Sequence, residues 1–386
     1  MADTLSSAVD SAIRLATHHH RLPPKCAASE RDNPVCSGTP IRPVWGALSN
    51  TVGGQVLPET TNMTDVQVLV TGGSGFVGAH CIVALLNAGC RVRTTIRSPK
   101  RESDVRRILA AGGAQAGDGL TFAVTDLTSD DGWPEAVDGC EYVLHVASPF
   151  PAADPEHEED VIVPARDGAL RVLRAADDAG VKRVVLTSSF AAIGYGHGSV
   201  DREFTEEDWT NLDGDGVTAY VKSKVLAERA AWDFTDNQGG ASDLTVVNPV
   251  ATFGPVLNDD ISSSVVPILT LISAGFEQMP NISFPVADVR DVADIHLRAM
   301  THPAAAGERF IACCDGGPIT IREAAYILRD WTGVDDVIKA PIIGDVQHPS
   351  NHKAKTVLGW SPRSIDEALL STAGSLVRTG LIHFRA

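Results

Sequence analysis

Residues 66–78 read Val66-Gln67-Val68-Leu69-Val70-Thr71-Gly72-Gly73-Ser74-Gly75-Phe76-Val77-Gly78, and this stretch decides the fold. Its first five residues are largely apolar and β-branched, which predicts a strand, and the apolar spacing over 76–87 predicts a helix. A glycine-rich turn between a strand and a helix is typical of a dinucleotide-binding loop, whose phosphates meet the helix N-terminus. Three glycines have separate tasks there: Gly72 permits the tight turn, Gly75 admits the pyrophosphate, and Gly78 lets the helix pack closely. We therefore expect a dinucleotide to contact Gly72, Gly75, Phe76, Val77 and Gly78.

The alternation of strand and helix continues to about residue 250. Further strands are predicted at 91–96, 120–124, 141–145, 183–187 and 244–248. Helical segments separate them, from Glu102 onward and near 130–138, 158–179 and 219–236. Such alternation implies a parallel sheet with helices on both faces and a ligand crevice at the carboxyl ends of the strands. The predicted fold class is α/β, a Rossmann-type doubly wound parallel sheet with a smaller C-terminal α/β substrate-binding cap.

Three regions differ in character. Residues 1–62 hold six prolines and a run of three histidines without sustained periodicity, so we expect a disordered extension or a start codon assigned too far upstream. Residues 63–250 are predicted to form the Rossmann domain. Residues 251–386 are expected to form mainly the substrate-binding cap, with 286–300 returning to the Rossmann domain. The patterns Thr-x-x-Glu at 320–323 and Ser-x-x-Glu at 364–367 predict capping boxes that open two helices.

Charge and composition exclude several classes of partner. The formal net charge of −17 repels polyanions, so we expect neither nucleic acid nor a membrane surface as a partner. No apolar run approaches the roughly 18 to 20 residues that span a bilayer. The seven cysteines are an odd number whose spacing matches neither a disulfide framework nor a metal site. We therefore expect no metal, a reducing, cytoplasmic location, and a monomer or homodimer.

The end of the second strand indicates which dinucleotide binds. NAD-specific sites usually place an acidic residue there to hold the ribose 2′-hydroxyl, whereas this chain has Arg97, followed closely by Lys100 and Arg101. A guanidinium can bind a 2′-phosphate through two hydrogen bonds. We therefore expect NADPH/NADP+ rather than NAD, held by Arg97 and Lys100. Asp126 and Leu127, after the third strand, are expected to flank the adenine, although Asp126 could equally cap the next helix.

The sequence Tyr220-Val221-Lys222-Ser223-Lys224 carries the candidate catalytic pair. Tyr220 and Lys224 are four residues apart and therefore share one face of the predicted helix. A free phenol titrates near pH 10, and a neighbouring ammonium, together with an oxidised nicotinamide, is expected to lower that value. Ser189, at the end of the fifth strand, is the expected hydrogen-bond donor to a substrate carbonyl, with Ser188 as the alternative.

From residue 64 onward the chain resembles an extended short-chain dehydrogenase/reductase. Within that superfamily it is most similar to the dihydroflavonol-reductase-like branch, which includes cinnamoyl-CoA reductases and aldehyde or methylglyoxal reductases. The matching segments are residues 70–78 (VTGGSGFVG), 92–97 (VRTTIR), 145–149 (HVASP), 186–189 (LTSS), 220–224 (YVKSK), 248–249 (NP) with 254–255 (GP), and 288–293 (DVRDVA).

The resemblance implies a role for each matching residue. Tyr220 would donate the proton to the carbonyl, Lys224 would bind the nicotinamide ribose and tune the tyrosine, and Ser189 would polarise the carbonyl. The cofactor would be lined by Ala147 and Ser148, with Pro249 near the nicotinamide amide, and His145 would be structural. The sequence lacks the plant cinnamoyl-CoA signature around the tyrosine, and Phe190 stands where many relatives have alanine.

We therefore expect an NADPH-dependent reductase that acts on the carbonyl of a small aldehyde or ketone. Five residues near the strand ends could form an apolar pocket for this substrate, although each is also a plausible core residue: Phe150, Phe190, Tyr195, Phe253 and Val256. Oxidation of a secondary alcohol, as by a 3β-hydroxysteroid dehydrogenase, is an alternative because the reaction is reversible. A sugar-nucleotide epimerase and a non-enzymatic NADP-sensing regulator share the fold. Arg97 argues against the epimerase, the missing acid after Ser189 against a dehydratase, and the Tyr220–Lys224 pair against the regulator.

Overall fold

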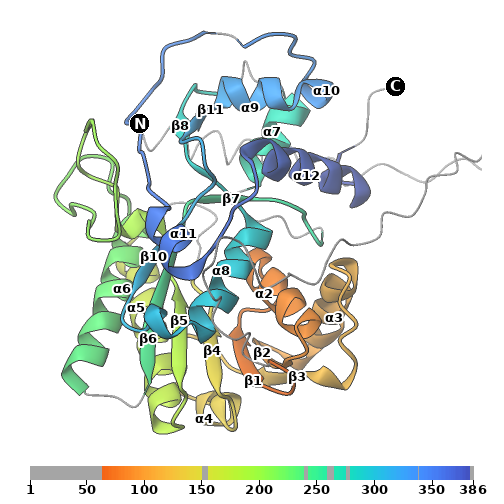
Figure 1. The fold of residues 1–386 in the computed structure, drawn as a ribbon, viewed down its shortest axis with the longest axis vertical. Helices are drawn as coiled ribbons and strands as arrows, with labels where there is room; N and C mark the ends of the chain where they lie inside the picture. Colours follow the sequence, from red (N-terminus) through yellow and green to blue (C-terminus); the bar gives the residue numbers. More distant parts are fainter. Residues whose placement is uncertain are drawn as a thin grey trace, which may run out of the picture.

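A parallel sheet of seven strands forms the lower half of the molecule (Figure 1). The structure is a computed structural model, and it describes residues 63–149, 155–238, 242–258, 265–274, 279–337 and 339–382. From one edge of the sheet to the other, the strands are β10 (Arg309–Ala312), β6 (Asp243–Pro249), β5 (Arg183–Thr187), β4 (Tyr142–His145), β1 (Gln67–Thr71), β2 (Arg91–Ile96) and β3 (Leu120–Val124). The strand order reverses next to β1, so the carboxyl ends of β1 and β4 lie at the expected crevice.

Helices cover both faces of this sheet, which confirms the predicted fold class. One face carries α2 (Phe76–Asn87), α3 (Glu102–Ala111) and α8 (Val289–Thr301), and the other carries α4 (Trp133–Val137), α5 (Glu159–Asp178) and α6 (Ala219–Gln238). Side chains along β1 alternate between the two layers, because Val68 and Val70 pack in the first core and Leu69 in the second. The short apolar runs of the sequence are therefore strands buried on both faces.

The edge strand β10 was not expected from the sequence. It pairs in parallel with β6, from Arg309 opposite Val246 to Ala312 opposite Pro249. It lies close in sequence to α8, which packs against β5 and β6. Residues that follow position 250 thus complete the main sheet at this edge.

The C-terminal part stands above the sheet in Figure 1 and has its own core. Its elements are β7 (Ala251–Phe253), α7 (Val266–Ala274), β8 (Ser283–Phe284), β9 (Val286–Asp288), β11 (Ile319–Thr320), α9 (Ile321–Ile327), α10 (Arg329–Thr332), α11 (His352–Leu358) and α12 (Ile365–Arg378). Strand β7 pairs with β9, and β8 pairs with β11. The helix α11 differs from the rest because it contacts β10 and α8 of the sheet layer.

Both predicted helix starts in this part are present, but only one is a full capping box. Thr320 and Glu323 exchange hydrogen bonds reciprocally at the start of α9. At α12, Ser364 accepts a hydrogen bond of 3.1 Å from the amide of Glu367, as predicted. The Glu367 carboxylate instead forms ion pairs with arginines, so the second half of that box is absent.

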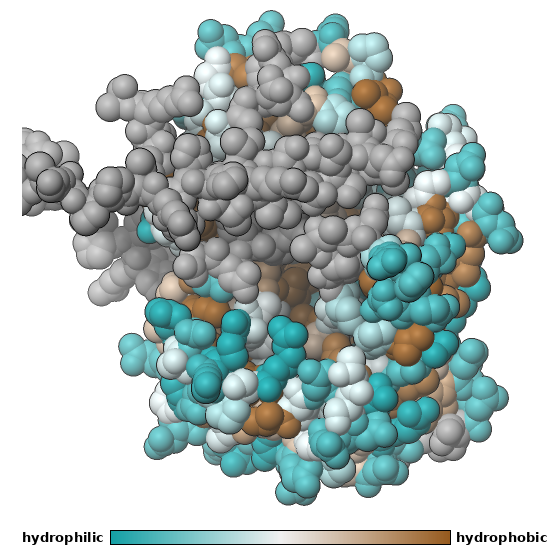
Figure 2. Space-filling view, turned by 180° about the vertical axis from the view of Figure 1, so that it is seen from behind, coloured by the Kyte–Doolittle hydropathy of each residue, from teal (hydrophilic) through white to brown (hydrophobic). Residues whose placement is uncertain are grey.

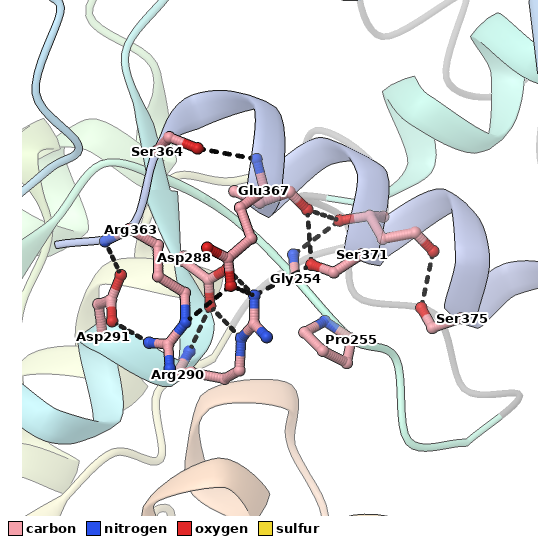
Figure 3. Close-up of polar contacts among 12 residues, drawn as sticks. Gly254, Pro255, Asp288, Arg290, Asp291, Arg363, Ser364, Glu367, Ser371 and Ser375 are labelled. Carbon is pink, nitrogen blue, oxygen red and sulfur yellow. Dashed lines mark hydrogen bonds and ion pairs between the residues drawn. The ribbon is translucent and has the colours of Figure 1, made fainter. Parts of the chain in front are cut away.

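These arginines belong to an ionic cluster that ties α8 to α12 (Figure 3). Asp288 caps α8 and binds the Arg290 guanidinium, with Oδ2 to Nη2 at 2.6 Å. Arg290 also reaches Glu367, and Arg363 bridges Glu367 to Asp291. Burial raises the pKa of Asp291 to about 6, although the Arg363 backbone amide and guanidinium oppose that rise. The cluster is therefore a network of ion pairs that connects α8 of the sheet layer to α12 of the C-terminal part.

The segment 254–256 follows β7 and is held from both sides. The amides of its first and last residues donate to the hydroxyls of Thr372 (2.7 Å) and Ser375 (2.8 Å) on α12. From the opposite side, His80 on α2 donates through Nε2 to the carbonyl of the middle residue, at 2.9 Å. A side chain at Gly254 would meet Val289 at 2.8 Å, and its φ of +126° also favours glycine. This segment thus joins the helix of the glycine loop to the C-terminal helix.

Hydrophilic residues predominate over the lower part of the face shown in Figure 2, with scattered hydrophobic ones between them. No helix among the described residues is both long and apolar enough to cross a membrane.

Candidate active site

The glycine loop joins β1 to α2 in a tight turn, in which three of the four residues at 72–75 are glycines. Gly72 has a φ of +72°, and a Cβ at Gly78 would lie 2.4 Å from the Gly72 carbonyl oxygen, so both positions require glycine. The α2 N-terminus begins after Gly75 without a side-chain cap and without an acidic residue in its first turn. Its amides are therefore left for an anionic ligand, which is what the phosphates of a dinucleotide need.

The carboxyl end of β4 packs directly against this loop. Thr71 accepts hydrogen bonds through Oγ1 from the amides of Val146 (3.0 Å) and Ala147 (2.9 Å). A Cβ at Gly72 would meet that of Ala147 at 3.0 Å. Ala147 thus lies beside the glycine loop, and Ser148 lines a hollow with Lys224.

The predicted 2′-phosphate side lies at the ends of β2 and β3. Arg97 is exposed at the end of β2, and Lys100 is exposed in the short 3-10 helix Pro99–Arg101. Asp126 accepts hydrogen bonds from the amide and hydroxyl of Thr128, which, together with the Arg97 charge, lower its pKa despite partial burial. Leu127 packs against α5 at Gly168. Two exposed basic side chains, Arg97 and Lys100, therefore follow β2, where the 2′-phosphate of NADP is predicted to bind.

Three predicted catalytic residues meet at the start of α6. A hydrogen bond links the hydroxyls of Ser189 and Tyr220, and the Lys224 ammonium lies 5.7 Å from the Tyr220 ring centroid. Ser189 also accepts a hydrogen bond from the Ala191 amide, at 3.1 Å. Pro249 ends β6, opposite Ala312 of β10. The structure therefore brings Ser189, Tyr220 and Lys224 together at the carboxyl edge of the sheet.

The acidity of Tyr220 differs from the sequence-based expectation. Burial raises the pKa of Tyr220 to about 12, and the Ser189 hydrogen bond only partly offsets this. Burial also lowers the pKa of Lys224 to about 8, a change that the negative charge of Glu228 opposes. In the protein alone, desolvation thus outweighs the expected lowering of the phenol pKa by the ammonium.

Residues 68–313, from β1 through β10, match the NAD dependent epimerase/dehydratase family. The chain belongs to this family. Among its curated relatives, cinnamoyl-CoA reductase CAD2 of Medicago truncatula is 35% identical over 64% of this chain and 76% of its own length. Dihydroflavonol 4-reductase of Hordeum vulgare is 33% identical over 79% of this chain and 87% of its own length.

Two solved structures of reductases are similar to this chain over most of its length. Yeast methylglyoxal/isovaleraldehyde reductase Gre2, complexed with NADPH, has a TM-score of 0.72 and 29% identity, covering 82% of this chain and all of its own. Vestitone reductase from alfalfa has a TM-score of 0.69 and 26% identity, covering 82% of this chain and 99% of its own. The predicted membership of the extended short-chain dehydrogenases/reductases is confirmed, and the chain is an oxidoreductase.

In this family member, Ser188 and Ser189 face different partners. Ser188 donates to the Glu228 carboxylate at 2.5 Å, whereas Ser189 lies at Tyr220. This division favours Ser189 over Ser188 as the donor to a substrate. Glu228 is fully buried one turn after Lys224 and was missed from the sequence. Its spacing places it on the helical face of Tyr220 and Lys224, but that spacing alone does not distinguish it from an exposed glutamate.

His145 is a buried, neutral residue at the end of β4. The Thr71 hydroxyl lies 2.8 Å from His145 Nδ1, and because it already accepts two amide hydrogens, it donates to this nitrogen. Burial, and secondarily the Lys224 charge, lower the pKa of His145 to about 3. It lines the same hollow as Lys224, and its structural role stays a prediction.

The predicted apolar pocket is wrong for the three residues that are buried in the cores. Phe190 packs in the sheet core against Phe204, with ring centroids 6.0 Å apart. Phe253 and Val256 belong to the core of the C-terminal part. Tyr195 packs against Phe190 at the edge of the sheet core, and Phe150 lies outside the described residues. These apolar side chains that follow strands therefore pack in the cores. The sequence alone does not distinguish a core side chain from one that lines a pocket.

Proposed function

We propose that the protein is an NADPH-dependent reductase of aldehydes or ketones with Tyr220 as the proton donor. The observation that carries this proposal is the meeting of Ser189, Tyr220 and Lys224 at the sheet edge that also holds the glycine loop. The NADPH bound to the yeast methylglyoxal/isovaleraldehyde reductase supports the cofactor. Arg97, exposed where NAD-binding sites usually have an acid, supports the phosphorylated form.

The site fits a dinucleotide because the α2 N-terminus has no side-chain cap and no acidic residue in its first turn, and glycines occupy positions 72, 73 and 75 of the turn before it. Bound NADPH supplies a hydride to the carbonyl carbon. The chain supplies the rest: the Ser189 hydroxyl donates a hydrogen bond to the carbonyl oxygen, and Tyr220 transfers its proton to that oxygen to give the alcohol. Lys224, charged and buried beside Tyr220, stabilises the phenolate that remains.

The test is Tyr220→Phe, assayed by NADPH absorbance against a panel of aldehydes, diketones, flavonoids and steroid ketones. We expect turnover to fall at least about 100-fold, the usual contribution of a positioned acid, with NADPH affinity within a factor of two to three. Tyr142→Phe is the matched control, because Tyr142 lies at the opposite end of its strand β4 from His145. Near-normal turnover by Tyr220→Phe would rule out the proposed mechanism.

A further inference from the structure

The buried carboxylate of Glu228 lies where three strand segments meet beside α6. Its Oε2 accepts from Ser188 Oγ after β5 (2.5 Å) and from Asn248 Nδ2 in β6 (2.8 Å). Its Oε1 accepts from Arg309 Nε in β10, at 2.6 Å, and more weakly from Trp232 Nε1, at 3.4 Å. Glu228 has no exposed surface, so it stays in the core only because these groups satisfy it.

We propose that Glu228 is a positioning residue of the candidate active site: it keeps the Lys224 ammonium charged and fixes the strand ends beside Ser189. This inference rests on the proposed function, because it assigns Glu228 a task in the proton transfer by Tyr220. Three residues, Tyr220, Lys224 and Glu228, then act in series along one face of α6.

Glu228 supplies a negative charge to the buried Lys224 ammonium. Lys224 is 8% exposed, and among the described residues the opposite charge that acts on it is the carboxylate four residues later. The groups around it from other elements supply no substitute: His145 on β4 is neutral, and α5 contributes the uncharged Ala165 and Ala169 to the shared hollow. Without the Glu228 charge, burial would lower the pKa of Lys224 further and leave a neutral amine at pH 7.

Glu228 is also linked by hydrogen bonds to the residues around Ser189. The side-chain NH2 of Asn248 donates two hydrogen bonds, one to the Glu228 carboxylate at 2.8 Å and one to the backbone carbonyl of Ser189 at 3.2 Å. Ser188, the neighbour of Ser189, is bound to the same carboxylate oxygen. The position of the Ser189 hydroxyl against Tyr220 is therefore set through Glu228.

Arg309 forms an ion pair with the Glu228 carboxylate through Oε1. Its guanidinium also donates to the carbonyls of Glu206 (2.6 Å) and Asp208 (2.9 Å) and lies 4.1 Å from the Trp209 ring centroid. The Glu206 carboxylate, nearby, accepts from the Ile311 amide. Arg309 thus has other partners that hold it, and Glu228 can interact with both cations, Arg309 and Lys224.

Glu228→Gln removes the negative charge and nearly preserves the shape of the side chain. With its amide oxygen in the place of Oε2, the glutamine still accepts from Ser188 and Asn248, so the Asn248 NH2 also stays on the Ser189 carbonyl. The bond from Arg309 Nε is lost, but Arg309 keeps its bonds to the carbonyls of Glu206 and Asp208.

The experiment measures the pH dependence of hydride transfer in single turnovers with NADPH from pH 6 to 9.5. We expect wild-type activity to be lost as pH rises through the Lys224 pKa of about 8, because only the ammonium assists Tyr220. In Glu228→Gln this loss moves to lower pH by about 1 to 3 units, the usual effect of one nearby opposite charge. Glu228→Asp, which keeps the charge, should largely restore the wild-type profile. Ser188→Ala, which removes a hydrogen bond but no charge, should leave the position of the profile unchanged.

An unshifted profile in folded Glu228→Gln would overturn the inference, as would an equal shift in Ser188→Ala. If the single variant does not fold, Glu228→Gln combined with Arg309→Gln removes both charges of the ion pair and should show the same shift. The proposed function fails separately, by activity that persists in Tyr220→Phe.

Discussion

We expect the buried Lys224 ammonium to lower the free energy of unfolding of the protein. The pKa of Lys224 is about 8 in the folded protein against 10.5 for a free lysine. One pKa unit corresponds to about 1.4 kcal/mol, so holding this ammonium in the folded state costs about 3 kcal/mol. Lys224→Met retains most of the aliphatic volume and removes that cost, and Glu228 keeps its ion pair with Arg309. We therefore expect the variant to be inactive but more stable at pH 7, by up to about 3 kcal/mol.

The assay is urea unfolding of both proteins from pH 7 to 10. Between pH 8 and 10.5 the unfolded wild type binds more protons at position 224 than the folded one, so its stability rises with pH. The advantage of Lys224→Met should therefore shrink above pH 8. Lys222→Met is the matched control, because Lys222 forms a surface ion pair with Glu158 at 2.7 Å and should change stability by at most about 1 kcal/mol. A Lys224→Met protein less stable than wild type at pH 7 would refute this reasoning.

Three further outcomes are expected. Gly78→Ala places a Cβ 2.4 Å from the Gly72 carbonyl oxygen, so calorimetry should show lost NADPH binding and about 1 to 3 kcal/mol lower stability. Gly374→Ala, whose Cβ would make an ordinary contact of 3.8 Å with Arg378 Nη1, should be near neutral. Arg97→Asp should shift the ratio of kcat/KM toward NADH at least about tenfold, and an unchanged ratio would contradict the assignment of the 2′-phosphate site. Ser189→Ala should lower kcat about 100-fold with NADPH affinity preserved, whereas a change in affinity alone would exclude its role at the carbonyl.

The sequence predicted the sheet well where local patterns decide the structure. Residues 91–96, 120–124 and 183–187 are strands with the predicted bounds, and the helix 76–87 is likewise unchanged. The predicted helix near 130–138 is shorter, Trp133–Val137, because Gly132 adopts a φ of +78° before it. Strand β10 escaped prediction because its four residues gain their strand pairing only from the distant β6.

The site was predictable only in part, because burial depends on distant partners. The spacing of Tyr220 and Lys224 could be read from the helix period, and their proximity followed from it. Glu228 is indistinguishable in sequence from a solvent-exposed helical glutamate, since its partners Ser188 and Arg309 come from other strands. The raised pKa of Tyr220 could not be predicted for the same reason. Burial by residues from other parts of the chain raises it, and this effect outweighs that of the neighbouring Lys224.

The ion pair between Glu228 and Arg309 affects the order in which the chain can fold during synthesis. The two residues are 81 positions apart, with β7, α7, β8, β9 and α8 between them in the chain. During synthesis, α6 leaves the ribosome long before Arg309, so a nascent chain that ends before Arg309 must bury Glu228 without its ion-pair partner or leave this layer open. Residues 63–250 alone therefore should not yield a stable fragment, and splitting or fusing this enzyme at position 250 should fail, whereas a break after β10 preserves the pair.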